Sequence, residues 1–175
     1  MIRSFRLAAC SVVSMALLAA CATPVPQAPP PPPVDTVALV AQIRAAVGPE
    51  DAKDELAIQP LRDPMVEDFR QQATRFENEH KYAEAAAALD QALAIVGDDP
   101  AVLQERAEAA LLAADFAGAE AFARKAHDVG AQVGPLCRRH WATIRASREH
   151  AKDDAGVAEA QKQFDACRVA APPRY

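Results

Sequence analysis

Residues 63–97 read DPMVEDFRQQATRFENEHKYAEAAAALDQALAIVG, and residues 99–130 read DPAVLQERAEAALLAADFAGAEAFARKAHDVG. Placed one above the other, the two stretches repeat small and bulky apolar residues at an interval of 34 positions. Five pairs keep this interval: Phe69 and Leu103, Ala73 and Ala107, Tyr82 and Phe116, Ala85 and Ala119, and Ala92 and Ala126. A period of about 34 residues is typical of stacked helix pairs, because one pair cannot bury its apolar face without a neighbour.

Proline and glycine mark where the helices of this array begin and end. Asp63-Pro64 and Asp99-Pro100 each place a side-chain acceptor before a first-turn proline, and Gly134-Pro135 repeats the arrangement with glycine as a weaker cap. Gly97 and Gly130 follow the second helices, where a left-handed C-cap is expected. The predicted helices are 64–80, 82–96, 100–114, 116–129, 135–150 and 154–169.

The repeated stretch resembles the tetratricopeptide repeat (TPR) family. The first unit carries the family's pattern of small and bulky residues at Phe69, Ala73, Phe76, Tyr82, Ala85, Leu89 and Ala92. The second unit keeps five of these positions and departs from the pattern at Ala110 and Ala123, where the family has larger residues. The resemblance implies an all-α fold of antiparallel helix pairs, stacked as a short right-handed solenoid with N-terminal capping helices.

The third unit departs further from the family pattern. Ala160, Phe164 and Cys167 keep the spacing of a second helix, but Trp141 falls on a position that the family fills with a small residue. Either the repeat frame shifts in this unit, or the unit is an atypical terminal cap. The domain is therefore expected to span residues 63–171, with units of about 63–97, 98–131 and 134–169.

In the family, the first helices of the units line a concave groove that holds a peptide or a partner's helix. Carried over to this chain, the groove consists of Arg70, Thr74, Glu77, Asn78, Gln104, Glu108, Arg138 and Arg145. Arg138 and Arg145 are seven residues apart and so share a helix face. With Arg70 they are expected to pair with carboxylates of an extended partner, the alternative being a solvated basic helix face.

The first 21 residues resemble the leader of a bacterial lipoprotein. Arg3 and Arg6 precede a mostly apolar run over 7–20, and Leu18-Ala19-Ala20-Cys21 is similar to a lipobox. The resemblance implies that residues 1–20 are removed and that Cys21 carries a diacylglycerol and an N-acyl chain such as palmitate. Since Ala22 is not aspartate, the periplasmic face of a Gram-negative outer membrane is the expected location. The alternatives are an ordinary cleaved signal peptide and a short membrane anchor.

Two segments connect the leader to the array. Residues 21–33 form a proline-rich linker, which favours an extended polyproline II spacer over a ligand for a proline-recognition groove. In the following segment, 34–62, the residues Val40, Ile43 and Val47 share a helical face, and a second short helix is expected within 51–58. This segment is expected to cap the array, the alternative being a helix that docks onto a partner.

Two cysteines remain beyond the leader, Cys137 and Cys167. Each lies 15 residues from Lys152, near the predicted turn of the last helix pair. In an antiparallel pair, residues equidistant from the turn are neighbours, and exported proteins favour oxidised cysteines. A disulfide is therefore predicted, the alternative being two reduced and buried side chains.

Composition and motifs narrow the function. The chain has 19 basic and 24 acidic residues, and without Arg3 and Arg6 of the leader its net charge is −7, which argues against nucleic-acid binding. Its four histidines lack metal-ligand spacing, and no catalytic motif, cofactor motif or small-molecule site is evident. We expect a non-enzymatic, lipid-anchored periplasmic module that binds a protein or peptide, a scaffold or assembly factor of pilus, secretion or outer-membrane/peptidoglycan machinery. The alternative is a regulatory subunit of a periplasmic enzyme, or an enzyme without a recognisable motif.

Overall fold

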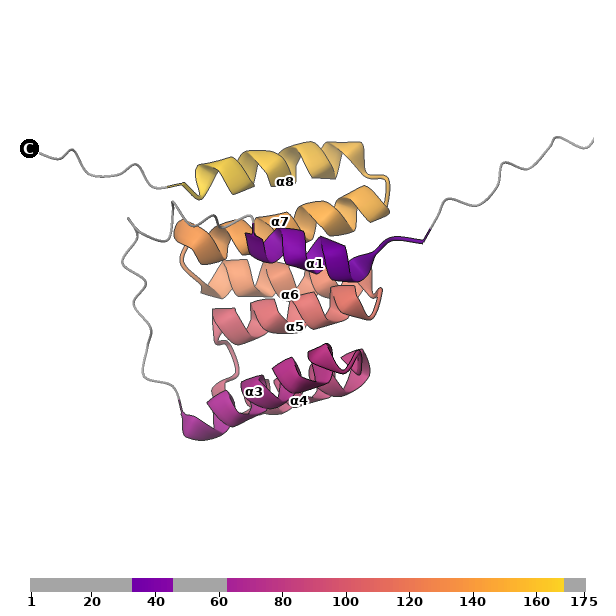
Figure 1. Ribbon diagram of the computed structural model, residues 1–175. Coiled ribbons are helices and arrows are strands. Elements are labelled where there is room, and N and C mark those ends of the chain that lie inside the picture. The colour runs from indigo at the N-terminus through magenta and orange to yellow at the C-terminus, as the bar shows by residue number, and fades with distance from the viewer. Residues whose placement is uncertain (1–32, 46–62, 169–175) are drawn as a thin grey trace, which may run out of the picture. The chain divides into compact units, whose positions relative to one another are not determined.

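The computed structural model describes residues 33–45 and 63–168, which form seven helices and no strand. The helices are α1 (Thr36–Ala45), α3 (Pro64–Asn78), α4 (Tyr82–Val96), α5 (Pro100–Leu112), α6 (Phe116–Val129), α7 (Gly134–His150) and α8 (Asp154–Ala166). The pairs α3–α4, α5–α6 and α7–α8 stack side by side, with α1 lying across the inner helices (Figure 1). The predicted all-α, repeat-like fold is confirmed. Within the described ranges, no helix has the length and apolarity needed to cross a membrane.

Several sequence predictions concern residues outside these ranges. They are the signal peptide at 1–20, the lipidated Cys21, the proline-rich linker up to residue 32 and the short helix within 51–58.

Aspartate caps begin two of the helices as predicted. Asp63 accepts a hydrogen bond from the Met65 amide at 2.8 Å, and Asp99 accepts from the amides of the first turn of α5. The predicted cap at Gly134 is wrong, because α7 begins with Gly134 itself and its N-cap residue is Val133. The Gly134 N–H instead donates to the Cys167 carbonyl at 2.7 Å, which ties the start of α7 to the end of α8.

The two predicted glycine C-caps differ from each other. Gly97 has the left-handed φ of 61° that was expected, whereas Gly130 is extended, with φ −94° and ψ −177°. The prediction for Gly130 is therefore wrong in conformation. A Cβ atom at that position would lie 2.7 Å from the Ala126 carbonyl and 3.0 Å from Pro100 Cβ. Glycine is needed there because the end of α6 closely approaches the start of α5.

The turn inside each helix pair has the same geometry, although the sequence gave no sign of it. His80, Ala114 and Lys152 occupy the left-handed region, with φ of 58°, 60° and 57°. The next residue in each turn donates its N–H to a carbonyl five positions back: Lys81 to Phe76, Asp115 to Ala110 and Asp153 to Arg148. None of the three turn residues is glycine, which is the usual marker of this conformation.

The third unit keeps the helix-pair architecture with a longer first helix. The helix α7 has 17 residues and α5 has 13, a difference of about one turn. Trp141 is buried in α7 and meets the His127 ring edge-to-face, with 4.9 Å between the ring centroids. Ala160, Phe164 and Cys167 are buried as their spacing predicted. The frame of the array thus shifts at α7.

Two apolar cores lie on either side of α5. The first core joins α3 and α4 to Val102 and Ala109 of α5. The second core joins the other face of α5 to α6, α7, α8 and α1. Both are rich in alanine, which lets the helices approach closely but leaves little tolerance for larger side chains.

Candidate partner-binding groove

Helix α1 covers the inner helices α5 and α7, the surface on which the resemblance places a partner. Its Val40 and Ile43 side chains are 1% and 4% exposed, while Val37 on the same helix is 49% exposed. The Thr36 hydroxyl donates to the Leu112 carbonyl at 3.3 Å. The chain therefore fills part of its own groove.

A charged network lies beneath the end of α1, centred on the fully buried Glu108. Glu108 Oε1 accepts from Arg139 Nη2 at 2.6 Å and from Gln104 Nε2 at 2.9 Å. Glu108 Oε2 accepts from Arg44 Nε of α1 at 2.7 Å. The other nitrogen of this guanidinium, Arg44 Nη2, reaches Glu77 of α3 at 3.0 Å. Arg44 thus connects α1, α3 and α5 through ion pairs.

The buried side of this network includes a neutral histidine. Gln104 Nε2 donates to Thr143 Oγ1 at 2.9 Å, so its amide oxygen faces His140 Nδ1 at 2.7 Å and assigns the proton to that ring nitrogen. Desolvation by burial lowers the pKa of His140 to about 3, and the charges of His127 and Arg139 lower it further. The imidazole therefore stays uncharged at neutral pH.

This histidine predicts a loss of stability in mild acid. Because the pKa of His140 is lower in the folded chain than in the unfolded chain, the unfolded chain binds more protons between about pH 6.5 and pH 3. The free energy of unfolding should therefore fall as the pH falls through that window, by up to about 1.4 kcal/mol per pH unit. Urea unfolding at several pH values measures this slope.

Two variants separate His140 from the other titrating groups. His140→Gln keeps a donor for Gln104 and should flatten the slope. His80→Gln, at an exposed turn, should keep the wild-type slope. Equal slopes in all three chains would contradict the assignment.

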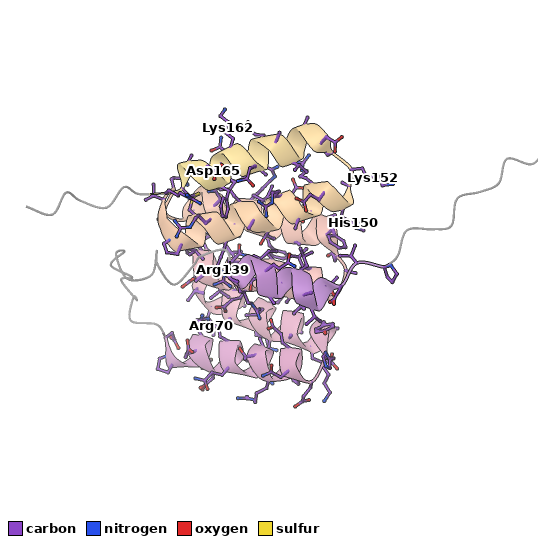
Figure 2. All side chains as sticks on the ribbon, turned by 45° about the horizontal axis from the view of Figure 1, so that its top comes forward. Arg70, Arg139, His150, Lys152, Lys162 and Asp165 are labelled. Atoms are coloured by element: carbon purple, nitrogen blue, oxygen red, sulfur yellow. A yellow bond between two sulfur atoms is a disulfide. The ribbon has the colours of Figure 1, made fainter. Side chains whose placement is uncertain are left out.

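The part of the groove that α1 leaves open lies between α1, α3 and α5. A cavity of about 290 Å³ is lined at one end by Val37, Val40, Tyr82 and Leu112 among others. A second cavity of about 160 Å³ lies between Arg70, Thr74, Glu105 and Arg139. Arg44 and Glu77 line both cavities, so their ion pair divides a single groove into an apolar half and a charged half. Figure 2 shows Arg70 and Arg139 at the same end of α1.

The residues predicted on α3 line this open groove. Thr74 and Asn78 are exposed, Glu77 is half-buried, and Arg70 lies between two carboxylates. Arg70 forms ion pairs with Glu67 and Glu105, and the bonds to Glu105 are the largest cause that raises its pKa. Burial is the largest cause that raises the pKa of Glu77, which Arg44 opposes.

The residues predicted on α5 and α7 are placed differently from the expectation. Gln104 and Glu108 are fully buried, and they support the floor of the groove without lining its surface. Arg138 is 1% exposed, so it is not on the groove surface, whereas its neighbour Arg139 lines the charged half. The two first helices are offset by 35 residues, from Pro100 to Pro135, and a frame of 34 therefore selects the wrong arginine.

Arg145 lies at the edge of α7, apart from the open groove. Its guanidinium carbon stands 5.8 Å from the centre of the Phe164 ring of α8, and it bonds to Gln161. It also lines a small cavity beside Leu39 and Ile43 of α1. The three predicted arginines are therefore not brought together as one basic surface.

The charges around the groove are balanced within the chain. Arg44, Arg70 and Arg139 face four carboxylates, those of Glu67, Glu77, Glu105 and Glu108. An acidic partner would have to compete with these carboxylates for each arginine. The pairing of Gln104 and Glu108 with residues 35 positions later was the signal in the sequence that could have identified the network.

Cys137 and Cys167 lie in the last helix pair, away from the groove. They form a disulfide in the structure, with 5.7 Å between their Cα atoms. Among the residues at 33–45 and 63–168, no group of three or more histidine, cysteine, aspartate or glutamate side chains is placed to hold a metal ion.

Comparison with solved structures finds a similar domain. The globular C-terminal domain of LpoP from P. aeruginosa superposes with a TM-score of 0.56 and 29% sequence identity, over 60% of this chain and 99% of that domain. No protein-family model matches the sequence, and no curated protein matches it. The similarity supports the repeat-like helical class of the fold.

Proposed function

We propose that this chain is a protein-interaction module of the bacterial cell envelope, acting as a scaffold or assembly factor in pilus, secretion or outer-membrane/peptidoglycan machinery. The observation that carries the proposal is the open groove between α1, α3 and α5, with one apolar half and one charged half. Such a groove suits an extended or helical segment of another protein. The similarity to the LpoP domain supports, in general terms, a protein-binding role in the envelope. We further propose TPR-like recognition without catalysis or a cofactor.

The proposal includes a lipid anchor at Cys21, with the module facing the periplasm from the outer membrane. The support is the lipobox-like Leu18-Ala19-Ala20-Cys21 and the proline-rich spacer that follows it. Intact-mass analysis of the mature protein should find an acylated N-terminal cysteine. An unmodified Cys21, or cleavage elsewhere, would overturn this part of the proposal.

The groove is tested with one exposed position on α3. Thr74→Arg places a long side chain in the charged half of the groove and should reduce capture of the partner from detergent-solubilised envelopes by at least about tenfold. Because Thr74 is exposed, the free energy of unfolding should change by no more than about 0.5 kcal/mol.

Gln91→Arg is the matched control, since Gln91 is an exposed polar residue on α4 and does not line the groove. It should capture the partner as the wild type does. If Gln91→Arg abolishes capture and Thr74→Arg does not, the binding surface lies on the outer helices and the proposal is wrong.

A further inference from the structure

Helix α1 is held on the array by few contacts. It has 10 residues and two buried side chains, whereas α5 has nine buried residues. A helix this short is marginally stable by itself in water. Its helical form therefore depends on its position against α5 and α7, which makes it the element most easily exchanged for another helix.

The contacts of α1 follow a short sequence pattern. Val40 and Ile43 are one turn apart and buried, and Arg44 comes directly after Ile43. The apolar pair lies beside Leu112 at one end and Ala142 and Ala146 at the other. Arg44 places its guanidinium between the carboxylates of Glu77 and Glu108. The groove thus recognises two apolar side chains three residues apart, followed by a cation.

The network beneath α1 stays largely paired if α1 leaves. Glu108 Oε1 keeps its bonds from Arg139 and Gln104, whereas Oε2 and Glu77 lose the bonds from Arg44. What opens is an apolar surface beside two carboxylate groups. This arrangement is complementary to another helix that carries a basic residue in the place of Arg44.

We propose that α1 is a displaceable occupant of the groove, and that the partner contributes an amphipathic helix with the pattern apolar-x-x-apolar-basic. The proposal rests on the proposed function and names the chemistry of its partner. While α1 is seated, it competes with the partner, and the apparent affinity of the wild-type chain is reduced by the fraction in which the groove is closed.

The test uses the full chain and a fluorescent peptide of residues 34–45, which stands in for the partner's helix. Val40→Ser with Ile43→Ser removes both apolar anchors of α1 and should open the groove. Fluorescence anisotropy should show that this variant binds the peptide at least about tenfold more tightly than the wild type. Val37→Ser is the matched control, because Val37 is exposed on the same helix, and it should bind as the wild type does.

The charge contacts are tested with a second peptide. Replacing its arginine by glutamate should weaken binding to the opened variant by about tenfold. Glu77→Arg, introduced into the opened variant, should restore binding of the glutamate peptide. Arg44→Glu in the full chain provides an independent way to loosen α1, in case the double variant loses its circular dichroism.

Each other outcome overturns the proposal. Equal peptide affinity in the wild type, the opened variants and Val37→Ser would show that the groove does not exchange helices. Equal affinity for both peptides would show that the carboxylates do not read a cation. A wild-type dimer in light scattering, with α1 exchanged between copies, would assign the groove to a second copy of the chain. If these tests fail while Thr74→Arg still reduces partner capture, the proposed function stands and displacement of α1 is wrong.

Discussion

Ala119→Arg is expected to abolish cooperative folding, whereas Ala117→Arg is expected to leave it intact. Ala119 is fully buried in the second core, on the face of α6 that packs against its neighbours. Overpacking a close-packed core costs about 1–3 kcal/mol, and burying an arginine without a partner adds several kcal/mol more. Since a domain of this size is stable by only about 5–15 kcal/mol, the sum is comparable to its whole stability.

Thermal melts followed by circular dichroism distinguish the two variants. Ala117 is exposed on the same helix and receives the same new side chain, so it controls for the helix propensity and the charge of arginine. A cooperative melt of Ala119→Arg at the wild-type temperature would contradict the packing of α5 against α6 described here.

Reduction of the disulfide between Cys137 and Cys167 is expected to have the second largest effect. The two cysteines are 30 residues apart in sequence, and their Cα separation of 5.7 Å lies in the usual range for disulfides. On the chain-entropy model, a closed loop of this length stabilises the fold by about 3–4 kcal/mol. A reducing agent should lower the free energy of unfolding by that amount.

The variant Cys137→Ala with Cys167→Ala is the control for this experiment. It should start from the lower stability and show no response to the reducing agent. Non-reducing peptide mapping of the exported protein should recover the crosslinked pair. An unchanged melting temperature of the wild type under reduction would contradict a stabilising crosslink.

Most of the fold was predictable from local signals in the sequence. The interval of 34 residues and the Asp-Pro caps located six helices within a few residues of their observed ends. The bounds of 82–96 and 116–129 agree with α4 and α6. The left-handed residues His80, Ala114 and Lys152 were not predictable, because tertiary packing holds a conformation that the residue types do not favour.

The groove was less predictable than the fold. The exposed residues of α3 were identified correctly in position, because one unit fixes its own helix face. Arg138 was placed on the groove surface because a shift of one residue turns a side chain by about 100° around its helix, and the frame was off by one at α7. The position of α1 was not predictable in detail, because its contacts with Glu77 and Glu108 join residues 33 and 64 positions apart.

The division of the apolar interior into two cores has a consequence for local unfolding. The first core connects α3 and α4 to the other described helices through α5, whereas α7 and α8 are tied by the disulfide. The pair α3–α4 is thus expected to open as a unit, with faster amide hydrogen exchange than α7–α8. Since α3 forms one wall of the groove, a partner bound between α3 and α5 should slow that exchange. Protection of the α3 amides would then report how fully the groove is occupied.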